Sequence, residues 1–437
     1  MNVQRDSFLD ALPMGWTFDR LKDVVSLRNK KTDLASSDED YLELEDLESG
    51  TGRILNRRNT LDVGSAVTLF KEGDVLFGKL RPYLEKFYEA EFDGKCTGEI
   101  LAFKPERIAG RYLFYCIGSR WFIERCNTLA YGAKMPRVNW PTQLSQFNIP
   151  LPPLPEQERI AAYLDASCVA IDAAVAAKRR QIETLANARR SIIAQAVTKG
   201  LDRRAEQRDS GVEWFGAIPK HWRCEHLKRF ATRIQTGCTP PTDTPDYYLD
   251  GTIPWYAPGS YDGDIELGEP RKLINELARR EGALRVFPAE TVFLVGIGAT
   301  IGKVGLIRAE AACNQQLIGI VTNHRLLGRY LAYQYKIYED VIPRIASATT
   351  LPIFDQVKTG YLPTLQPPRE EQEAICTFLD AKLAEVKRID AGIESQIATL
   401  VAYRKSLIHE CVTGQRRITQ SDVARSGGES RPEGRDS

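Results

Sequence analysis

The segment Gly296–Lys303 is rich in glycine and ends in lysine, two features that could bind a phosphate group. A phosphate-binding loop of the Gly-x-x-x-x-Gly-Lys-Ser/Thr type needs glycine where Ile297 stands and a hydroxyl group where Val304 stands. The dinucleotide-binding pattern Gly-x-Gly-x-x-Gly fails at Ile301. The sequence therefore predicts a tight glycine turn between two strands, not a nucleotide site.

Other residue patterns that could carry chemistry are incomplete. His221, Cys224 and His226 are close together, but their spacing suits no common zinc pattern, and the next candidate ligand, Cys238, is remote. The segment Asp93–Lys95 could end a nuclease motif, yet no Pro-Asp precedes it nearby, and no Asn/Asp-Pro-Pro-Tyr/Phe motif of an amino-methyltransferase occurs. We therefore predict no catalytic residue, no metal site and no cofactor in this chain.

Composition is that of an ordinary globular protein of roughly two to four domains, with 437 residues, 43% hydrophobic and 27% charged. Nine scattered cysteines, odd in number and without a Cys-x-x-Cys pair, are typical of free thiols in a reducing cytoplasm. We expect neither a signal peptide nor an apolar run of about 18 residues, and hence no membrane association. A net charge of +1 excludes a uniformly basic DNA-coating protein but permits basic residues confined to certain faces.

Several loops combine polar, basic and aromatic residues, and loops held by a rigid scaffold are the usual place for recognition. The short apolar runs Asp74–Gly78 and Thr291–Val295 predict buried strands of such a scaffold. Residues 111–126 and 329–338 have helical spacing. The candidate loops are Arg53–Asn59, Lys79–Lys86, Thr236–Asp243 and Ile253–Asp262.

Two long helices must position these loops. A Pro-rich elbow, residues 151–155, precedes Glu156-Gln157-Glu158 and a long stretch without proline or glycine, which predicts the start of a helix. The same pattern returns 215 residues later, at Pro367-Pro368 and Glu371-Gln372-Glu373. Heptad spacing of apolar residues predicts that the two helices pair as an antiparallel coiled coil. The predicted seam includes Leu164, Ile171, Val175, Lys178, Ile182, Leu185, Leu379, Val386, Asp390, Ile393, Ile397 and Leu400.

The regions between the helices are also repeated. Leu12-Pro13 and Trp16 recur as Ile218-Pro219 and Trp222, and Gly110–Leu113 recurs unchanged as Gly328–Leu331. The predicted fold class is α/β, a tandem repeat of two mixed α/β recognition domains, each followed by a long helix. The predicted boundaries are 1–150 and 207–364 for the domains, 151–206 and 365–415 for the helices, and 416–437 for a disordered tail.

These motifs resemble the specificity subunits of type I restriction-modification enzymes. The resemblance covers about residues 5–415. The beginning of the first repeat departs from it, because it is truncated and lacks the full Glu-Trp-Phe-Gly segment. It rests on the elbow 151–158, the helix end Ala196–Leu201, and the segments Asp209–Trp222, Thr239–Pro240 through Ile253–Trp255, Ala299–Lys303 with Asn314-Gln315, and Phe77–Tyr83.

The resemblance implies a non-catalytic subunit with two target recognition domains, each reading one half of a bipartite double-stranded DNA sequence. It further implies two methyltransferase subunits and, in the full complex, motor-nuclease subunits as partners. S-adenosylmethionine, ATP and magnesium would then belong to those partners. A DNA-binding regulator with two modules and a coiled-coil adaptor without nucleic acid remain as alternatives.

Each domain must supply donors for phosphates and base edges. Trp16 and Trp222, beside the repeated proline, are predicted to be core residues and not base-stacking ones. The candidate DNA contacts are Arg53, Arg57, Arg58, Lys79, Arg81 and Lys134 in the first domain, and Arg233, Gln235, Thr239, Lys303 and Lys358 in the second. For each of them a solvated surface role is the alternative.

Two further expectations concern the helices. Antiparallel pairing about the midpoint sets Lys178 opposite Asp390, where a buried ion pair would penalise other registers; both could instead extend to solvent. A two-helix coil also leaves apolar faces uncovered for large partners. The residues expected on such faces include Ala173, Ala174, Ala177 and Ile193.

Overall fold

The computed structural model describes residues 7–29, 31–32, 40–59, 67–346 and 353–427. These residues form two compact units, each of which combines one globular region with parts of both long helices. The first unit comprises residues 1–179 and 394–437, and the second comprises residues 180–393. Each compact unit therefore contains one of the globular domains predicted from the sequence, and both predicted long helices are divided between the two units.

The first unit is built on a four-stranded antiparallel sheet with the strand order β2-β10-β7-β8. A second sheet has the order β3-β6-β9-β4-β5, and β1 pairs with β11. The strands are β1 (Thr17–Arg20), β2 (Val25–Leu27), β3 (Lys31–Thr32), β4 (Asp40–Leu42), β5 (Arg58–Asn59), β6 (Val67–Phe70), β7 (Val75–Gly78), β8 (Phe87–Glu89), β9 (Gly94–Cys96), β10 (Ile100–Pro105) and β11 (Asn148–Leu151). The helices are α1 (Leu21–Val24), α2 (Gly110–Ile117) and α3 (Arg120–Leu129), with 3-10 turns η1 (Ser7–Ala11), η2 (Leu44–Asp46), η3 (Pro82–Leu84) and η4 (Leu144–Gln146).

The second unit repeats this plan. Its sheet β15-β22-β19-β20 matches β2-β10-β7-β8, and its pair β14-β23 matches β1-β11. A third sheet has the order β17-β16-β21-β18, and β12 pairs with β13. The strands are β12 (Gln207–Asp209), β13 (Ala217–Pro219), β14 (Arg223–His226), β15 (Ala231–Thr236), β16 (Ile253–Tyr256), β17 (Lys272–Ile274), β18 (Val286–Phe287), β19 (Val292–Val295), β20 (Val304–Leu306), β21 (Ala311–Cys313), β22 (Leu317–Thr322) and β23 (Pro363–Gln366). The helices are α5 (Glu276–Arg280), α6 (Gly328–Lys336), α7 (Ile342–Ala346) and α8 (Gln356–Gly360), with η5 (Leu227–Arg229), η6 (Pro245–Tyr248) and η7 (Pro258–Ser260).

The strand predictions are confirmed, since all residues of β7 and β19 are buried. The glycine-rich segment 296–303 joins β19 to β20, which pair antiparallel, as predicted for a turn. Trp16 is 7% exposed and Trp222 is 1% exposed, so both are core residues. All nine cysteines are free thiols.

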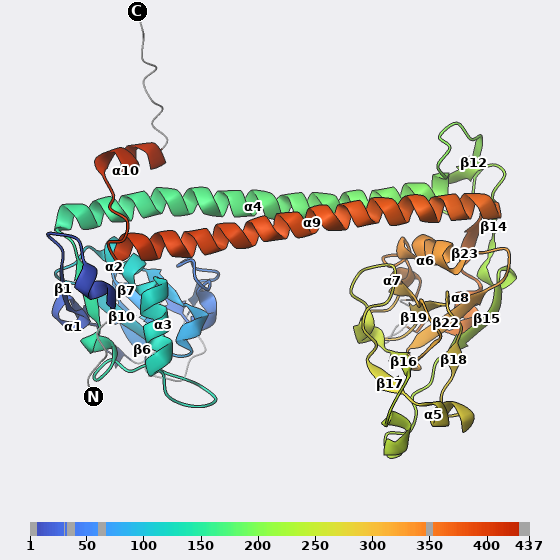
Figure 1. Cartoon of the computed structure of the whole chain (residues 1–437), viewed down its shortest axis with the longest axis horizontal. Helices are drawn as coiled ribbons and strands as arrows, with labels where there is room; N and C mark the ends of the chain where they lie inside the picture. The colour runs from blue at the N-terminus through green and yellow to red at the C-terminus, as the bar shows by residue number, and fades with distance from the viewer. Residues whose placement is uncertain (1–6, 30, 33–39, 60–66, 347–352, 428–437) are drawn as a thin grey trace, which may run out of the picture. The chain divides into compact units, whose positions relative to one another are not determined.

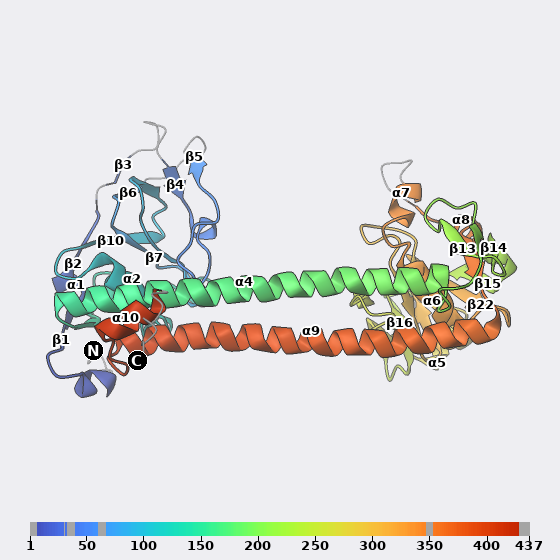
Figure 2. The same ribbon diagram turned by 90° about the horizontal axis from the view of Figure 1, so that it is seen from above.

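The long helices α4 (Leu154–Lys199) and α9 (Arg369–Val412) pack against each other (Figures 1 and 2). In the first unit, Leu164 and Ile171 of α4 share a core with Leu407 and Ile408 of α9. In the second unit, Val197 of α4 shares a core with α9 residues. Each helix thus packs its two ends into the cores of different units.

The predicted seam residues divide into two groups by burial. Leu164, Ile171, Val175, Leu379, Val386 and Ile393 are buried, whereas Lys178, Ile182, Leu185, Asp390, Ile397 and Leu400 are half-buried. The predicted partner of Lys178 is wrong, because its Nζ donates a hydrogen bond to Gln396 and not to Asp390. Ile193 was expected on an open face but is 3% exposed, in the core of the second unit.

Among the described helices, α4 alone is long and apolar enough, by length and composition, to cross a membrane. This differs from the expectation that no such run exists, because many alanines raise its mean hydropathy. In the structure, Ile160, Leu164 and Ile171 of α4 lie in the core of the first unit. A packed core helix of a globular protein meets the same criterion.

A glycine ends each long helix in the left-handed conformation, with φ of 72° at Gly200 and 77° at Gly414. The repeated tryptophan packs on each of them. A Cβ atom at Gly414 would lie 2.4 Å from Pro13 and 3.3 Å from Trp16, and one at Gly200 would lie 3.1 Å from Trp222. No larger residue fits without displacing these side chains.

The prediction of a disordered tail from residue 416 is wrong for the described part. Thr419 and Asp422 form a reciprocal capping box that begins α10 (Gln420–Ser426). Ile418 is 3% exposed and belongs to the core of the first unit, and Arg417 forms an ion pair with Glu156 at 2.9 Å. Residues 428–437 lie outside the described residues.

Candidate nucleic-acid interface

In the first unit, two loops come together on one edge of the central sheet. The loop after β7 and the loop after α3 are joined by backbone hydrogen bonds from Arg81 N to Pro136 O (2.7 Å) and from Val138 N to Lys79 O (3.0 Å). Tyr131 and Arg137 close the second loop through two backbone hydrogen bonds of 3.0 and 2.9 Å. The structure thus places the predicted contacts Lys79, Arg81 and Lys134 on one pair of loops.

This loop pair exposes aromatic and apolar side chains beside its cations. Tyr83 is 53% exposed, Tyr131 57% and Met135 47%. Lys134 is exposed and has no side-chain partner among the described residues. Cations suit phosphate oxygens, and apolar groups suit the methyl group of thymine in the major groove. The composition therefore fits contact with a DNA duplex.

The structure does not bring Arg53, Arg57 and Arg58 to this loop pair. Arg58 bonds to Asp46 (2.8 Å), Glu45 (2.7 Å) and Glu43 (3.3 Å), and the hydrogen bond with Asp46 is the main cause of its raised pKa. The guanidinium of Arg57 lies 4.2 Å from the centre of the Phe92 ring and 3.7 Å from Asp40. Arg53 forms an ion pair with Asp172 of α4. Each of these three arginines therefore has an intramolecular carboxylate partner.

In the second unit, the corresponding edge is formed by four loops. Gly296 N donates to Gln316 O (2.8 Å), and Phe354 N donates to Gly296 O (2.8 Å). Gly237 N donates to Leu317 O (3.0 Å). The glycine turn, the turn between β21 and β22, the segment before α8 and the loop after β15 therefore meet at one edge.

The predicted residues of the second unit differ in how they are held. The Thr239 hydroxyl donates to Gln315 Oε1 at 2.5 Å, and Lys358 Nζ donates to Ile353 O at 3.1 Å. Lys303 is exposed at the end of the glycine turn, without a side-chain partner in the described part of the chain. Gln235 is half-buried on β15. These four residues lie on or beside the edge where the loops meet.

Arg233 is placed differently. Its guanidinium stacks on Phe287, 4.3 Å from the ring centre, and donates to Val286 O at 2.8 Å. Its Nε is buried without a hydrogen-bond partner, and burial lowers its pKa. Arg233 of β15 therefore packs on β18 of the neighbouring sheet and does not present a free charge.

Sequence reasoning missed Gln315 and Gln356, which the structure places at the candidate interface. Gln315 is exposed next to Thr239, and Gln356 Nε2 donates to Thr236 Oγ1 at 3.1 Å. Asn314-Gln315 was part of the quoted motifs, so a signal for Gln315 was present. No local pattern marks Gln356, whose position depends on the folding of residues 353–360 against β15.

The helix with the repeated Gly-Arg-Tyr-Leu motif docks each recognition region onto the long helix that follows it. Arg111 and Tyr115 of α2 both bond to Asp165 of α4, at 2.6 Å from the nearest guanidinium nitrogen and 2.6 Å from the hydroxyl. Tyr112, which is fully buried, donates to Val412 O at the end of α9 (3.2 Å). This contact fixes the first interface on both long helices.

The second unit has the same contact. Arg329 and Tyr333 of α6 both bond to Asp380 of α9, with an Arg329–Asp380 distance of 2.7 Å. Tyr330 donates to Val197 O at the end of α4 (3.1 Å). Both interfaces are therefore fixed to the helices by the same residue types.

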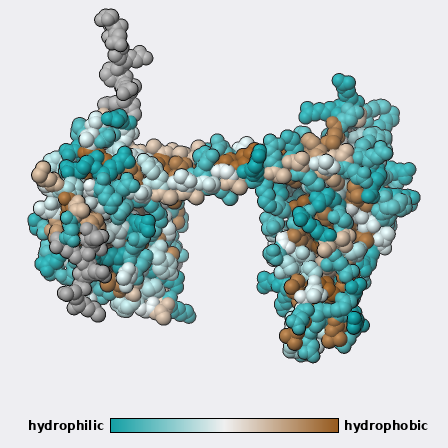
Figure 3. Space-filling model, in the orientation of Figure 1, coloured by the Kyte–Doolittle hydropathy of each residue, from teal (hydrophilic) through white to brown (hydrophobic). Residues whose placement is uncertain are grey.

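A different exposed surface lies near α5 of the second unit. Figure 3 shows apolar residues at the end of this unit where Figure 1 places α5. The exposed apolar residues of this segment are Leu249 (60%), Leu273 (48%) and Leu277 (42%), and Lys272 lies 4.6 Å from the centre of the Tyr248 ring. Exposed apolar patches with cations nearby are typical of binding surfaces.

Comparison with known proteins agrees with this architecture. The family described as "Type I restriction modification DNA specificity domain" matches residues 13–184 and 219–398. The chain belongs to this family and is a DNA specificity subunit of a type I restriction-modification system. Such a subunit is the non-catalytic chain of the enzyme.

Individual relatives are moderately similar. The chain is 28% identical over 195 residues to the type I restriction enzyme EcoDI specificity subunit of Escherichia coli, over 44% of this chain and 44% of that protein. It is 27% identical over 365 residues to the putative type I restriction enzyme MjaX specificity subunit of Methanocaldococcus jannaschii, over 79% of each. The chain thus matches less than half the length of the first relative and most of the second.

Solved structures share the fold. One chain comes from work on the structural basis of complex assembly and conformational transition of the type I R-M system; it has a TM-score of 0.75 and 20% identity and covers 93% of this chain and 99% of its own. The HsdS subunit from Thermoanaerobacter tengcongensis has a TM-score of 0.53 and 19% identity, with 93% and 98% coverage. The predicted family and the predicted fold class are confirmed.

Proposed function

We propose that each recognition region reads one half of a bipartite, asymmetric double-stranded DNA site. The main support is the loop edge, the edge of the central sheet where the recognition loops meet. Both units build this edge on equivalent strands but line it with different side chains. The first edge carries Arg81, Tyr83 and Lys134, and the second carries Thr239, Gln315 and Lys303. To read two different half-sites, two domains need the same scaffold with different side chains at the surface that contacts DNA.

The candidate residues have three different roles under this proposal. Lys79, Arg81, Lys134, Lys303 and Lys358 lie on the loop edges and would contact phosphates or guanines. Gln235, Thr239 and Gln315 can donate to and accept from base edges. Arg53, Arg57, Arg58 and Arg233 hold the loops and sheets through intramolecular contacts, so their contribution would be indirect.

The long helices would dock two methyltransferase subunits, and motor-nuclease subunits would join in the full complex. Apolar side chains exposed on the helices support this role, because water disfavours them. Val169 of α4 is 66% exposed, and Ile389 and Tyr403 of α9 are 41% and 49% exposed. S-adenosylmethionine, ATP and magnesium would be bound by those partners, in the cytoplasm.

Exchange of one recognition region tests whether each region reads its own half-site. Residues 207–364 would be replaced by the equivalent region of another specificity subunit, and the methylated motif would be determined by methylome sequencing. We expect one half of the motif to change while the other half and the gap remain. A change in both halves would show that the regions do not read independently.

A gel-shift experiment separates the remaining classes of function. A specificity subunit should bind its duplex more tightly when a methyltransferase is co-expressed, and both should elute as one complex in size-exclusion light scattering. A regulator would bind DNA equally well without the methyltransferase. A coiled-coil adaptor would bind no duplex under either condition.

A further inference from the structure

We propose that Arg137 and Glu99 are specificity-determining residues that together read one G·C base pair in the half-site of the first unit. This inference deepens the proposed reading of a bipartite site and rests on it. Arg137 lies in the loop after α3, and Glu99 lies directly before β10. Their side chains are 42% and 30% exposed and form an ion pair, with 3.2 Å between Arg137 Nη2 and Glu99 Oε1.

The backbone holds both residues at the loop edge of the first unit. Lys79 N donates a hydrogen bond to Glu99 O (2.9 Å), and Val138 N donates one to Lys79 O (3.0 Å). Arg137 itself forms an antiparallel β-bridge with Leu80. Contacts with one segment, the start of the loop after β7, therefore bring Glu99 and Arg137 together.

The guanidinium of Arg137 is held in place but keeps its hydrogen-bond donors. Among the described residues it forms the ion pair with Glu99 and no hydrogen bond, and Arg137 Nε and Glu99 Oε2 are buried without a hydrogen-bond partner. Arg58, by contrast, donates to three carboxylates. Since a guanidinium carries five N–H donors in a fixed planar arrangement, Arg137 can still donate two parallel hydrogen bonds to a ligand.

The chemistry of this pair matches a G·C base pair better than a phosphate. In the major groove, guanine offers the acceptors O6 and N7 to an arginine, and the cytosine of the same base pair offers its N4 amino group to a carboxylate. A phosphate beside Arg137 would meet the negative charge of Glu99. Lys134, on the same loop, is exposed and has no side-chain partner in the described part of the chain, so it suits the phosphate backbone.

The second unit carries different residue types at the equivalent positions. Gly296 N donates to Gln316 O (2.8 Å), Phe354 N donates to Gly296 O (2.8 Å), and Ile297 forms an antiparallel β-bridge with Ile353. These contacts match those of the first unit one by one, so Gln316 and Ile353 are the counterparts of the proposed pair. The same scaffold thus presents a charged pair in the first unit, and an amide with an apolar side chain that is 45% exposed in the second.

The test uses the full chain with its methyltransferase and determines the methylated motif by methylome sequencing. The half-site of the first unit is the half that stays the same when residues 207–364 are exchanged, and we expect it to contain a G·C pair. In Arg137→Ala, methylation of sites with another base pair at that one position should rise at least about tenfold relative to the G·C site. Every other position of the motif should stay the same. Glu99→Gln should have a smaller effect at the same position, because Arg137 remains.

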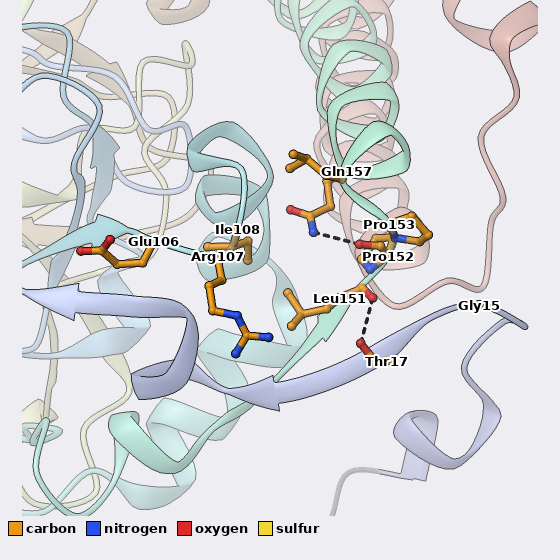
Figure 4. Close-up of a pocket in the computed structure, with 10 residues that line it drawn as sticks. Gly15, Thr17, Glu106, Arg107, Ile108, Leu151, Pro152, Pro153 and Gln157 are labelled. Atoms are coloured by element: carbon orange, nitrogen blue, oxygen red, sulfur yellow. Dashed lines mark hydrogen bonds between the residues drawn. The ribbon is translucent and has the colours of Figure 1, made fainter.

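Arg107→Ala is the matched control. Arg107 is also an exposed arginine of the first unit, and its guanidinium pairs with Asp19 at 3.3 Å. It follows β10, whereas Glu99 precedes this strand, and Figure 4 shows it near Ile108 and Leu151 at the elbow before α4. Its substitution should leave the motif unchanged.

A reciprocal variant decides the case in which Arg137→Ala abolishes all methylation. Gln316→Glu combined with Ile353→Arg gives the second unit the residue types of the proposed pair, and should create a preference of about tenfold for G·C at one position of the other half-site. A merely structural role of the pair would not move a base preference from one half-site to the other.

Three results would overturn the inference. They are the absence of G·C from the half-site of the first unit, an unchanged motif in an active Arg137→Ala or reciprocal variant, and a uniform loss of affinity in which the slope of log K against log salt falls by about 1, as for a phosphate contact. A change in both halves of the motif in Arg137→Ala would instead overturn the proposed function, since the two regions would then not read independently.

Discussion

Asp165 and Asp380 occupy equivalent positions on the two long helices, and each accepts hydrogen bonds from an arginine and a tyrosine of the repeated Gly-Arg-Tyr-Leu helix. Arg111 in addition bonds to Glu89 at 2.8 Å, and Arg329 in addition pairs with Glu266. The arginine in each docking contact therefore pairs with two carboxylates. The tandem repeat thus extends from the sequence to the individual hydrogen bonds that hold each recognition region.

Asp165→Asn should weaken the docking of the first recognition region. The change removes the charge that pairs with Arg111, and both side chains are about 40% exposed, so the expected loss is at most about 1 kcal/mol. Calorimetric unfolding should show a lower midpoint for the first unit. Glu183→Gln, an exposed position on α4, is the control and should leave the midpoint unchanged. Equal midpoints for Asp165→Asn and wild type would contradict the docking role.

The acid sensitivity of the second unit should depend partly on Asp264. The hydrogen bond from Lys387 is the main cause of its lowered pKa, with further contributions from Arg189. A carboxyl whose pKa is lower in the folded state contributes stability above its unfolded pKa of about 3.9. That contribution is lost as the pH falls through the folded pKa, and it amounts to at most about 1 kcal/mol because the side chain is 36% exposed.

Asp264→Asn should therefore lower the unfolding midpoint at pH 6, and the difference from wild type should shrink below about pH 4. Added salt should also reduce the difference, since the contacts are exposed. Asp340→Asn serves as the control, because Asp340 is 70% exposed and lies 3.7 Å from Arg190. A difference that persists at acid pH would show that the effect of the substitution is not electrostatic.

As phosphate contacts, Arg81 and Lys134 carry no sequence information, so Arg81→Ala and Lys134→Ala should weaken DNA binding uniformly across sequences. Loss of one phosphate contact reduces the slope of log K against log salt by about 1. Binding measured between 50 and 200 mM salt gives that slope. Lys104→Ala, at an exposed cation paired with Glu106, should leave it unchanged.

Arg58→Ala should behave in the opposite way. It leaves Asp46, which is fully buried, without its arginine, so the unfolding midpoint should fall while the salt slope stays the same. A reduced slope for Arg58→Ala, with unchanged stability, would place this arginine at the DNA after all.

A chain ending at Gln415 should have a less stable first unit. The truncation removes the buried Ile418 and leaves Glu156, which is 5% exposed, without the ion pair from Arg417. Burial of one isoleucine contributes about 1.5–3 kcal/mol, so the midpoint of the first unit should fall by several degrees. Arg425→Ala, exposed on α10, should have no effect. Unchanged stability after truncation would mean that α10 packs only weakly.

The sequence alone determined the tandem repeat, the two long helices, the glycine turn and the family. These features depend on local patterns, namely heptad spacing, Pro-rich helix starts and motifs that recur at a constant offset, and such patterns survive without knowledge of distant contacts. The capping residues Thr419 and Asp422 were a local signal of the same kind, and the polar composition around them concealed it.

Only the tertiary structure decided which cations are free. Arg53 and Lys134 look alike in sequence, but Arg53 pairs with Asp172, 119 residues away, whereas Lys134 has no side-chain partner within the described ranges. Lys178 likewise donates to Gln396, 218 residues away. A long charged side chain can reach several neighbours, and the tertiary fold decides which partner lies near it. Its role therefore depends on contacts that no local sequence spacing encodes.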